Sequence, residues 1–138
     1  MKATSGVVWG LAFACAALCV SASAQEAVHV SPDQVLSQEV SGMPTGAQQE
    51  VRVFTAAFKP GDKTVFHTHR FPVTVYVLEG TFTLEMEGRD PVHVMAGHAF
   101  VEPPHVMMTG YNRSAADPLR VVVFYVSDPD TPFLDPVH

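Results

Sequence analysis

The chain has 138 residues and a formal net charge of −6 at pH 7, with 47% hydrophobic and 16% charged residues. That length is enough for one domain with its own core. The acidic balance argues against nucleic acid or an anionic lipid surface as a partner, because both attract basic proteins. The composition therefore predicts a single ordinary globular domain.

The first 24 residues have the features of a secretory signal peptide. Lys2 gives a positive start, residues 7–20 are apolar and rich in alanine, and Ala22-Ser23-Ala24 supplies the small residues of a cleavage site. The alternative is an uncleaved membrane anchor, but an apolar run of about 14 residues is short for a membrane span. We expect cleavage after Ala24, export to the periplasm and no membrane contact afterwards.

Both cysteines of the chain, Cys15 and Cys19, lie in this segment. The mature protein, from Gln25, would therefore contain no cysteine, which excludes disulfides, thiolate metal sites and cysteine nucleophiles. An oxidising compartment such as the periplasm is compatible with this.

Residues 25–50 are polar and contain several prolines and glycines. They predict a loosely ordered arm, with one short helical turn near residues 32–37.

From residue 51 onward, short runs rich in β-branched and aromatic residues alternate with turn signals. In residues 81–87 every second residue is apolar, which is typical of a strand with one buried face. The predicted strands are residues 51–58, 64–69, 73–79, 81–87, 92–95, 98–102, 106–111 and 119–126. With no convincing helix, internal repeat or linker, the pattern predicts one all-β sandwich or barrel followed by an irregular tail.

His67 and His69 are two residues apart in one of these strands. Because strand side chains alternate, both rings are expected on the same face. Two imidazoles side by side can share one metal ion. The alternative is a pair of histidines that are hydrogen-bonded to the backbone and bind nothing.

The surroundings of this pair resemble the first signature motif of the cupin family. That motif reads Gly, five residues, His-x-His, three or four residues, Glu, six residues, Gly. Gly61, His67, His69 and Gly80 fall on it, and Val73 stands at the position of the glutamate.

The second cupin motif reads Gly, five residues, Pro-x-Gly, two residues, His, three residues, Asn. Gly97, Pro103 and Asn112 match it. His105 stands at its second glycine, and Met108 stands at its histidine.

The resemblance to small single-domain bacterial cupins implies a jelly-roll β-barrel, also called a double-stranded β-helix, over residues 51–138. It also implies a homodimer, because family members commonly pair through their sheets.

In cupins, three histidines and a glutamate converge on a divalent metal inside the barrel. The resemblance implies one transition metal ion held by His67, His69 and Met108, with His105 as a further candidate ligand. With the carboxylate replaced by Val73 and the third histidine by the thioether of Met108, the donor set favours Cu(I), so copper is the expected metal and Fe, Mn, Ni and Zn are the alternatives. If Met108 only fills a gap in the core, and His105 is a solvated loop residue, the site keeps two ligands.

Three functions remain open at this point. The first is a periplasmic copper-binding cupin. The second is an oxygenase or isomerase that uses iron, manganese or nickel and takes its carboxylate from Glu102. The third is a non-catalytic barrel with a vestigial metal site that binds an uncharged small molecule. The apolar pocket for that molecule would be lined by Val73, Val75, Val77, Phe100 and Met108.

Overall fold

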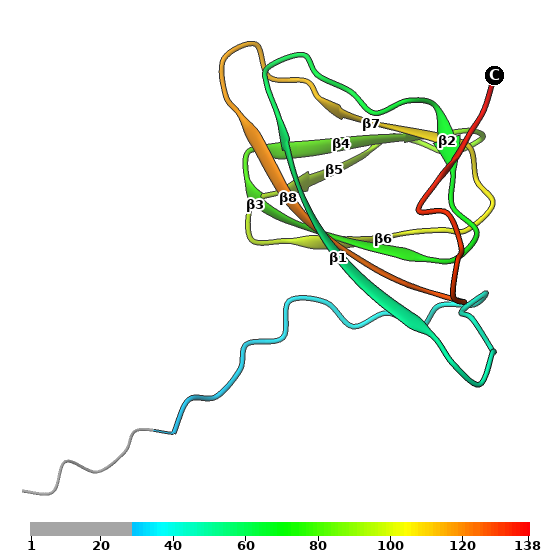
Figure 1. Ribbon diagram of the computed structural model, residues 1–138. Helices are drawn as coiled ribbons and strands as arrows, with labels where there is room; N and C mark the ends of the chain where they lie inside the picture. Colours follow the sequence, from blue (N-terminus) through cyan, green and yellow to red (C-terminus); the bar gives the residue numbers. More distant parts are fainter. Residues whose placement is uncertain (1–28) are drawn as a thin grey trace, which may run out of the picture. The chain divides into compact units, whose positions relative to one another are not determined.

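The computed structural model describes residues 29–138, and the folded unit considered below comprises Asp33–His138. Its strands are β1 (Glu50–Phe58), β2 (His67–Thr68), β3 (Val73–Glu79), β4 (Thr81–Met86), β5 (Val92–Met95), β6 (Ala99–Glu102), β7 (Met108–Asn112), β8 (Leu119–Ser127) and β9 (Asp135–Pro136) (Figure 1). They form two antiparallel sheets, with strand orders β1-β8-β3-β6 and β5-β4-β7-β2-β9. No helix between residues 29 and 138 is long and apolar enough to cross a membrane. The expected all-β fold is confirmed.

Three local predictions need correction. Residues 32–37 form no helical turn, because an isolated turn without tertiary contacts is too costly to nucleate. The second strand is shorter than expected. It is limited to His67–Thr68, because Thr64 bonds to Gly110 through both its backbone N–H (2.9 Å) and its hydroxyl (2.9 Å) and starts a loop there. The tail, expected to be irregular, adds the short strand β9.

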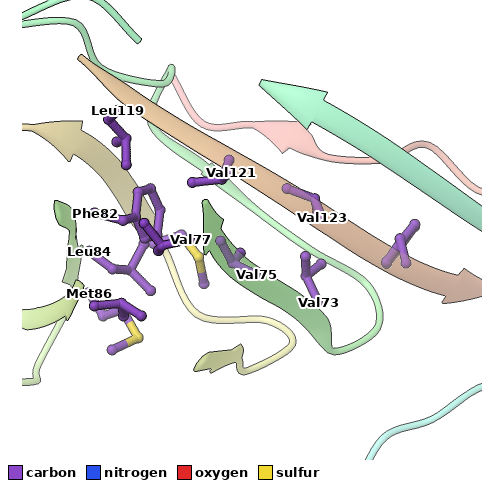
Figure 2. Packing of buried hydrophobic residues seen from close by; sticks show 12 residues of the cluster. Val73, Val75, Val77, Phe82, Leu84, Met86, Leu119, Val121 and Val123 are labelled. Atoms are coloured by element: carbon purple, nitrogen blue, oxygen red, sulfur yellow. The ribbon is translucent and has the colours of Figure 1, made fainter. Parts of the chain in front are cut away.

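The core lies between the inner faces of the two sheets. The alternation expected in residues 81–87 is confirmed for Phe82, Leu84 and Met86, which are all buried. Thr83, on the opposite face of this strand, is also buried, and its hydroxyl is hydrogen-bonded to the His93 ring (3.0 Å). The core comprises Val73, Val75, Val77, Phe82, Leu84, Met86, Val94, Met108, Leu119, Val121, Val123 and Tyr125, most of them visible in Figure 2. Each large apolar side chain buried in this way stabilises the fold by about 1.5–3 kcal/mol.

Gly80 shows why the first cupin motif ends in glycine. It joins β3 to β4 with a φ of 79°, a left-handed conformation that suits glycine. A Cβ at this position would lie 2.4 Å from the carbonyl oxygen of Pro118. The turn between the two strands therefore has no room for a side chain.

The outer face of the β1-β8-β3-β6 sheet is also largely apolar. Val53 on β1 pairs with Phe124 on β8, which pairs with Thr74 on β3 and, through it, with Val101 on β6. Val53 is 57% exposed and Phe124 is 43% exposed. Val53 and Phe124 leave part of this face exposed, and apolar residues of the preceding arm, Leu36, Val40 and Met43, line a hollow over it together with Thr74, Val101 and Phe124.

Candidate functional site

His67, on β2, and His69, just after it, are the centre of the candidate site. Both side chains are buried, with 4% and 1% of their surface exposed. Their Nε2 atoms lie 3.1 Å apart, and the rings meet edge to face at 82°. The two rings therefore converge inside the barrel, as the alternation of strand side chains predicts.

Both rings are oriented by backbone carbonyl groups. Nδ1 of His67 lies 2.7 Å from the oxygen of Val65, and Nδ1 of His69 lies 2.7 Å from the oxygen of Phe133. A carbonyl oxygen can only accept a hydrogen bond, so Nδ1 carries the hydrogen in each ring. The Nε2 atom of a neutral ring then has a free lone pair, and the two lone pairs face each other. Such a pair needs a cation or a shared proton between its nitrogens.

Glu102, the last residue of β6, brings a carboxylate to the same place. Its Oε2 lies 3.2 Å from Nε2 of His69, and 5% of the residue is exposed. Its direct cross-strand partner on β3 is Val73, the position at which the cupin motif has its glutamate. Residues directly opposite each other in antiparallel strands project to the same face. The carboxylate is therefore present on the inner face, one strand away from its usual position.

Met108 lies directly opposite His67 in the β2–β7 ladder, so both side chains project to the same face of this sheet. Met108 is completely buried among the core residues and does not line the pocket described below. The structure brings it beside the histidine strand, and its role as a ligand stays a prediction.

His105 has a backbone conformation that explains the glycine of the second motif. Its φ is 60°, in the left-handed region that few residues other than glycine adopt. Its backbone N–H donates to the carbonyl of His69 (2.8 Å), but its side chain is exposed and does not line the pocket. A ligand role for this ring also stays a prediction.

Burial lowers the pKa of His67, and the neighbouring His69 lowers it further, against the opposing effects of the Val65 carbonyl and the Glu102 carboxylate. His67 is therefore neutral at pH 7. Only the neutral ring of histidine has a lone pair with which to bind a metal ion.

A cavity of about 90 Å³ adjoins the two rings. Its walls come from both sheets and from the C-terminal segment. They consist of Ala56, Phe58, Thr64, His67, His69, Val75, Phe82, Glu102, Gly110, Val121, Val123, Phe133 and Leu134. Among the described residues, no lysine or arginine lines the cavity. The pocket expected from the sequence shares only Val75 with it, because Val73, Val77 and Met108 pack into the core instead.

The donor set is only partly assembled. Within residues 29–138 there is no group of three or more His, Cys, Asp or Glu side chains that could hold a metal ion as it stands. In that part of the chain Glu102 pairs with His69 and makes no ion pair with His67. The two imidazoles are therefore the preformed pair, and the carboxylate is held against one of them.

The comparison with protein families is decisive for the family. The model of the cupin domain matches residues 54–125, more than half of the chain. The chain belongs to the cupin family. The matched region contains both histidines, Glu102 and Met108, so every donor discussed above lies within the cupin domain.

Solved structures show the same fold. A cupin-like protein from Thermotoga maritima is 19% identical, with 63% of this chain matching 64% of that one at a TM-score of 0.54. An RmlC-like cupin from Methanocaldococcus jannaschii, described as a double-stranded β-helix, is 24% identical over 57% of this chain and 70% of its own (TM-score 0.51). The polyketide cyclase RemF from Streptomyces resistomycificus is 25% identical over 67% and 63% (TM-score 0.51). This cupin thus spans less than two thirds of the first and third of these chains. No curated protein matches the chain.

The sequence signal for Glu102 was incomplete. The residue was a candidate carboxylate because it lies close in sequence to Met108 and could replace the missing glutamate from a different strand. Its position beside His69 depends on the pairing of β3 with β6, which no local pattern encodes. The carbonyl of Phe133, 64 residues from His69 along the chain, had no signal in the sequence, because any residue type supplies a carbonyl.

Proposed function

We propose that this cupin binds one divalent metal ion through His67, His69 and Glu102 and uses it on a small uncharged molecule in the adjoining cavity. The observation that carries the proposal is the pair of Nε2 atoms 3.1 Å apart, in two rings whose Nδ1 atoms are both hydrogen-bonded to backbone carbonyls. Imidazole nitrogens bind ions such as zinc at about 2.0–2.1 Å. Two nitrogens on one ion therefore lie roughly 3 Å apart, which fits the observed pair.

The nature of the donors supports a hard or borderline ion. Two imidazoles and one carboxylate are the donor set of many Fe(II) sites, and carboxylates also suit manganese. Under this proposal Glu102, whose Oε2 lies 3.2 Å from Nε2 of His69, turns its carboxylate from that ring toward a shared ion. We therefore favour iron or manganese over copper, the metal expected from Met108.

The residues around the ion limit what the site can act on. A bound divalent ion polarises an oxygen of the ligand as a Lewis acid. His67 and His69 would hold the ion through rings fixed by backbone carbonyls, and Glu102 would balance its charge and could accept a proton from the bound molecule. The apolar wall excludes water and offers no basic side chain for a phosphate or a free carboxylate. These features favour a compact uncharged molecule with one polar group directed at the ion.

Copper remains a second candidate because of one specific observation. Met108 is the direct cross-strand neighbour of His67 and projects to the same face. Thioether sulfur is a soft donor that selects Cu(I). A site of two histidines and Met108 would serve copper handling or copper-dependent redox chemistry.

Two substitutions separate the candidates. Metal content would be measured in untagged protein, followed by titration with Fe(II), Mn(II) and anaerobic Cu(I). Under our proposal Glu102→Gln weakens Fe(II) or Mn(II) binding by at least about 10- to 100-fold, the loss typical when only an outer-shell partner of a metal ligand is removed. Met108→Leu, which conserves volume, leaves that binding unchanged. The reverse pattern with Cu(I) would establish the copper candidate, and an absence of binding by every ion would refute both.

The exposed residue His98 offers a matched control for these titrations. Its ring is hydrogen-bonded to the carbonyl of Ala96 (3.2 Å), as the site rings are to their carbonyls, but it lies outside the cavity. His98→Ala should therefore leave the number of bound ions unchanged. A loss of one ion in this variant would mean that the titration reports surface binding.

We also propose that the protein is exported to the periplasm and forms a homodimer. Export rests on the signal-peptide features of residues 1–24, which lie outside the described residues. The dimer rests on the exposed apolar row of Val53 and Phe124 on the outer face of the sheet. A second copy of the chain would cover this face.

A further inference from the structure

The C-terminal segment, residues 133–137, runs along the site and is called the strap below. Its strand β9 pairs with β2, with Thr68 opposite Asp135 and His67 opposite Pro136. The backbone N–H of Val137 donates to the carbonyl of Phe66 (2.9 Å). Figure 1 shows the strap in red beside β2. The strap is therefore attached along the strand that carries the site histidines.

The first two residues of the strap contact the site. Phe133 supplies the carbonyl that accepts from Nδ1 of His69 (2.7 Å), and its ring packs 5.0 Å from the His69 ring. The same ring lies 4.6 Å from Phe54 and 5.5 Å from Tyr125. Phe133 and Leu134 both line the cavity. The strap is thus both a wall of the cavity and the hydrogen-bond partner of one site histidine.

An exposed ion pair fastens the strap next to that histidine. The Arg70 guanidinium donates to both carboxylate oxygens of Asp135, at 2.8 and 2.9 Å. Arg70 follows His69 directly, and Asp135 lies two residues after Phe133. The ion pair therefore ties the two backbone segments whose spacing sets the His69–Phe133 hydrogen bond.

In the neutral form of His69, the single ring hydrogen has two alternative positions with opposite effects on metal binding. On Nδ1 it is donated to Phe133 and leaves the lone pair of Nε2 free. On Nε2 it would face two acceptors, Nε2 of His67 at 3.1 Å and Oε2 of Glu102 at 3.2 Å, and would occupy the position at which an ion binds. Those two acceptors favour the blocked form, and the strap carbonyl opposes it.

We propose that the strap is a positioning element that holds His69 in the tautomer able to bind metal, with Phe133 as the positioning residue. The effect of the strap on metal binding rests on the proposed function, because it requires that His69 binds a metal ion. Its first step, control of the His69 tautomer by the strap, can be observed without any metal. Release of the strap converts the two-histidine pair into a hydrogen-bonded, metal-blocking arrangement.

The test measures tautomers and metal affinity separately. Long-range ¹H–¹⁵N spectra of the histidine rings would be recorded on metal-free protein at neutral pH. The variants are Asp135→Asn and a chain that ends at Pro132. The matched control is Glu85→Gln, which breaks the Arg113–Glu85 pair. That pair is exposed to a similar degree (54% and 43% of the side chains, against 51% and 38% for Arg70 and Asp135) and lies away from the cavity.

We expect His69 to shift toward the Nε2–H tautomer in both strap variants, with His67 and the control unchanged. In the chain that ends at Pro132, loss of the Phe133 carbonyl should then weaken Co(II) binding by about 10- to 100-fold. In Asp135→Asn, where only the exposed ion pair is loosened, Co(II) binding should weaken by no more than about fivefold. The charge-swapped chain with Arg70→Asp and Asp135→Arg should restore the tautomer ratio toward that of the parent protein.

Each outcome decides the inference. An unchanged His69 tautomer in a folded truncated chain overturns it. If the truncated chain does not fold, an unchanged ratio in Asp135→Asn overturns it instead. A shifted tautomer with unchanged Co(II) affinity also overturns the link to metal binding. An absence of metal binding in the parent protein refutes the proposed function alone, since the tautomer shift would still be observed.

Discussion

Gly110 on β7 is predicted to be intolerant of even one methyl group. A Cβ at this position would lie 2.5 Å from Cε2 and 2.6 Å from Cζ of Phe82. Contact between carbon atoms is favourable at about 3.5–4 Å, so the ring would have to move by roughly 1 Å. Phe82 is buried and packs edge to face on Phe58, with ring centroids 6.4 Å apart. All three residues line the cavity.

Overpacking of this kind costs about 1–3 kcal/mol. For a folded unit of this size each kcal/mol lowers the Tm by about 4–8 °C. We therefore expect Gly110→Ala to lower the Tm by at least several degrees and to push the Phe82 ring toward the cavity. Thermal unfolding followed by circular dichroism measures the loss, and a crystal structure of the variant would show the ring.

A double-mutant cycle isolates the cause. Phe82→Leu shortens the side chain that meets the new methyl group, so Gly110→Ala should cost much less in that background than in the parent protein. Residues in direct contact typically show coupling of 0.5–3 kcal/mol, as an order-of-magnitude range. If the two losses simply add, or if Gly110→Ala alone is as stable as the parent, the clash is not the reason for glycine at this position.

Three further predictions concern the core, the surface and the strap. Leu84→Ala should destabilise the protein by about 2–5 kcal/mol, because Leu84 is completely buried; denaturant unfolding measures this, and a loss below 1 kcal/mol would contradict the packing. Phe124→Glu should convert the proposed dimer to a monomer in light scattering, and an unchanged mass would place any interface elsewhere. Arg70 lowers the pKa of Asp135 through their hydrogen bond. The pair therefore adds stability above the usual carboxyl pKa near 4, and the contribution is lost as the pH falls through the lowered value. The difference in unfolding free energy between the parent and Asp135→Asn should be present at pH 7 and shrink toward pH 2; a constant difference would rule out the ion pair as its source.

The strands were largely predictable because their signals are local. The bounds expected for residues 73–79 and 92–95 agree with β3 and β5 to the residue. In both segments β-branched residues lie between clear turn residues, and the hydrophobic pattern has period two. The expected strand at residues 64–69 was too long because Thr64 bonds to Gly110 outside the regular ladder. That contact is tertiary, so propensity along the chain could not reveal it.

The site was predictable only in the part that is contiguous in sequence. His67 and His69 share a face because of their spacing alone. The position of Glu102 requires the pairing of β3 with β6, and the orientation of His69 requires a backbone carbonyl from the tail. The distance from the Met108 sulfur to the histidines depends on a flexible side chain in the core. These three features arise from pairing and packing over long stretches of the chain.

The charge balance of the cavity supports the need for a cation. Glu102 is buried, and an unpaired buried carboxylate is costly. Among the described residues Glu102 interacts with the rings of His69, at 3.2 Å, and His67, and no lysine or arginine of the cavity wall offers a further partner. With the Nδ1 hydrogen of His69 donated to Phe133, the tautomer that can bind a metal ion directs the lone pair of Nε2 toward Glu102. Three acceptor atoms, two nitrogens and one oxygen, thus meet in an apolar setting. A positive charge between them removes both the repulsion and the desolvation cost, and the inward-facing lone pairs are the arrangement by which a metal ion can supply that charge.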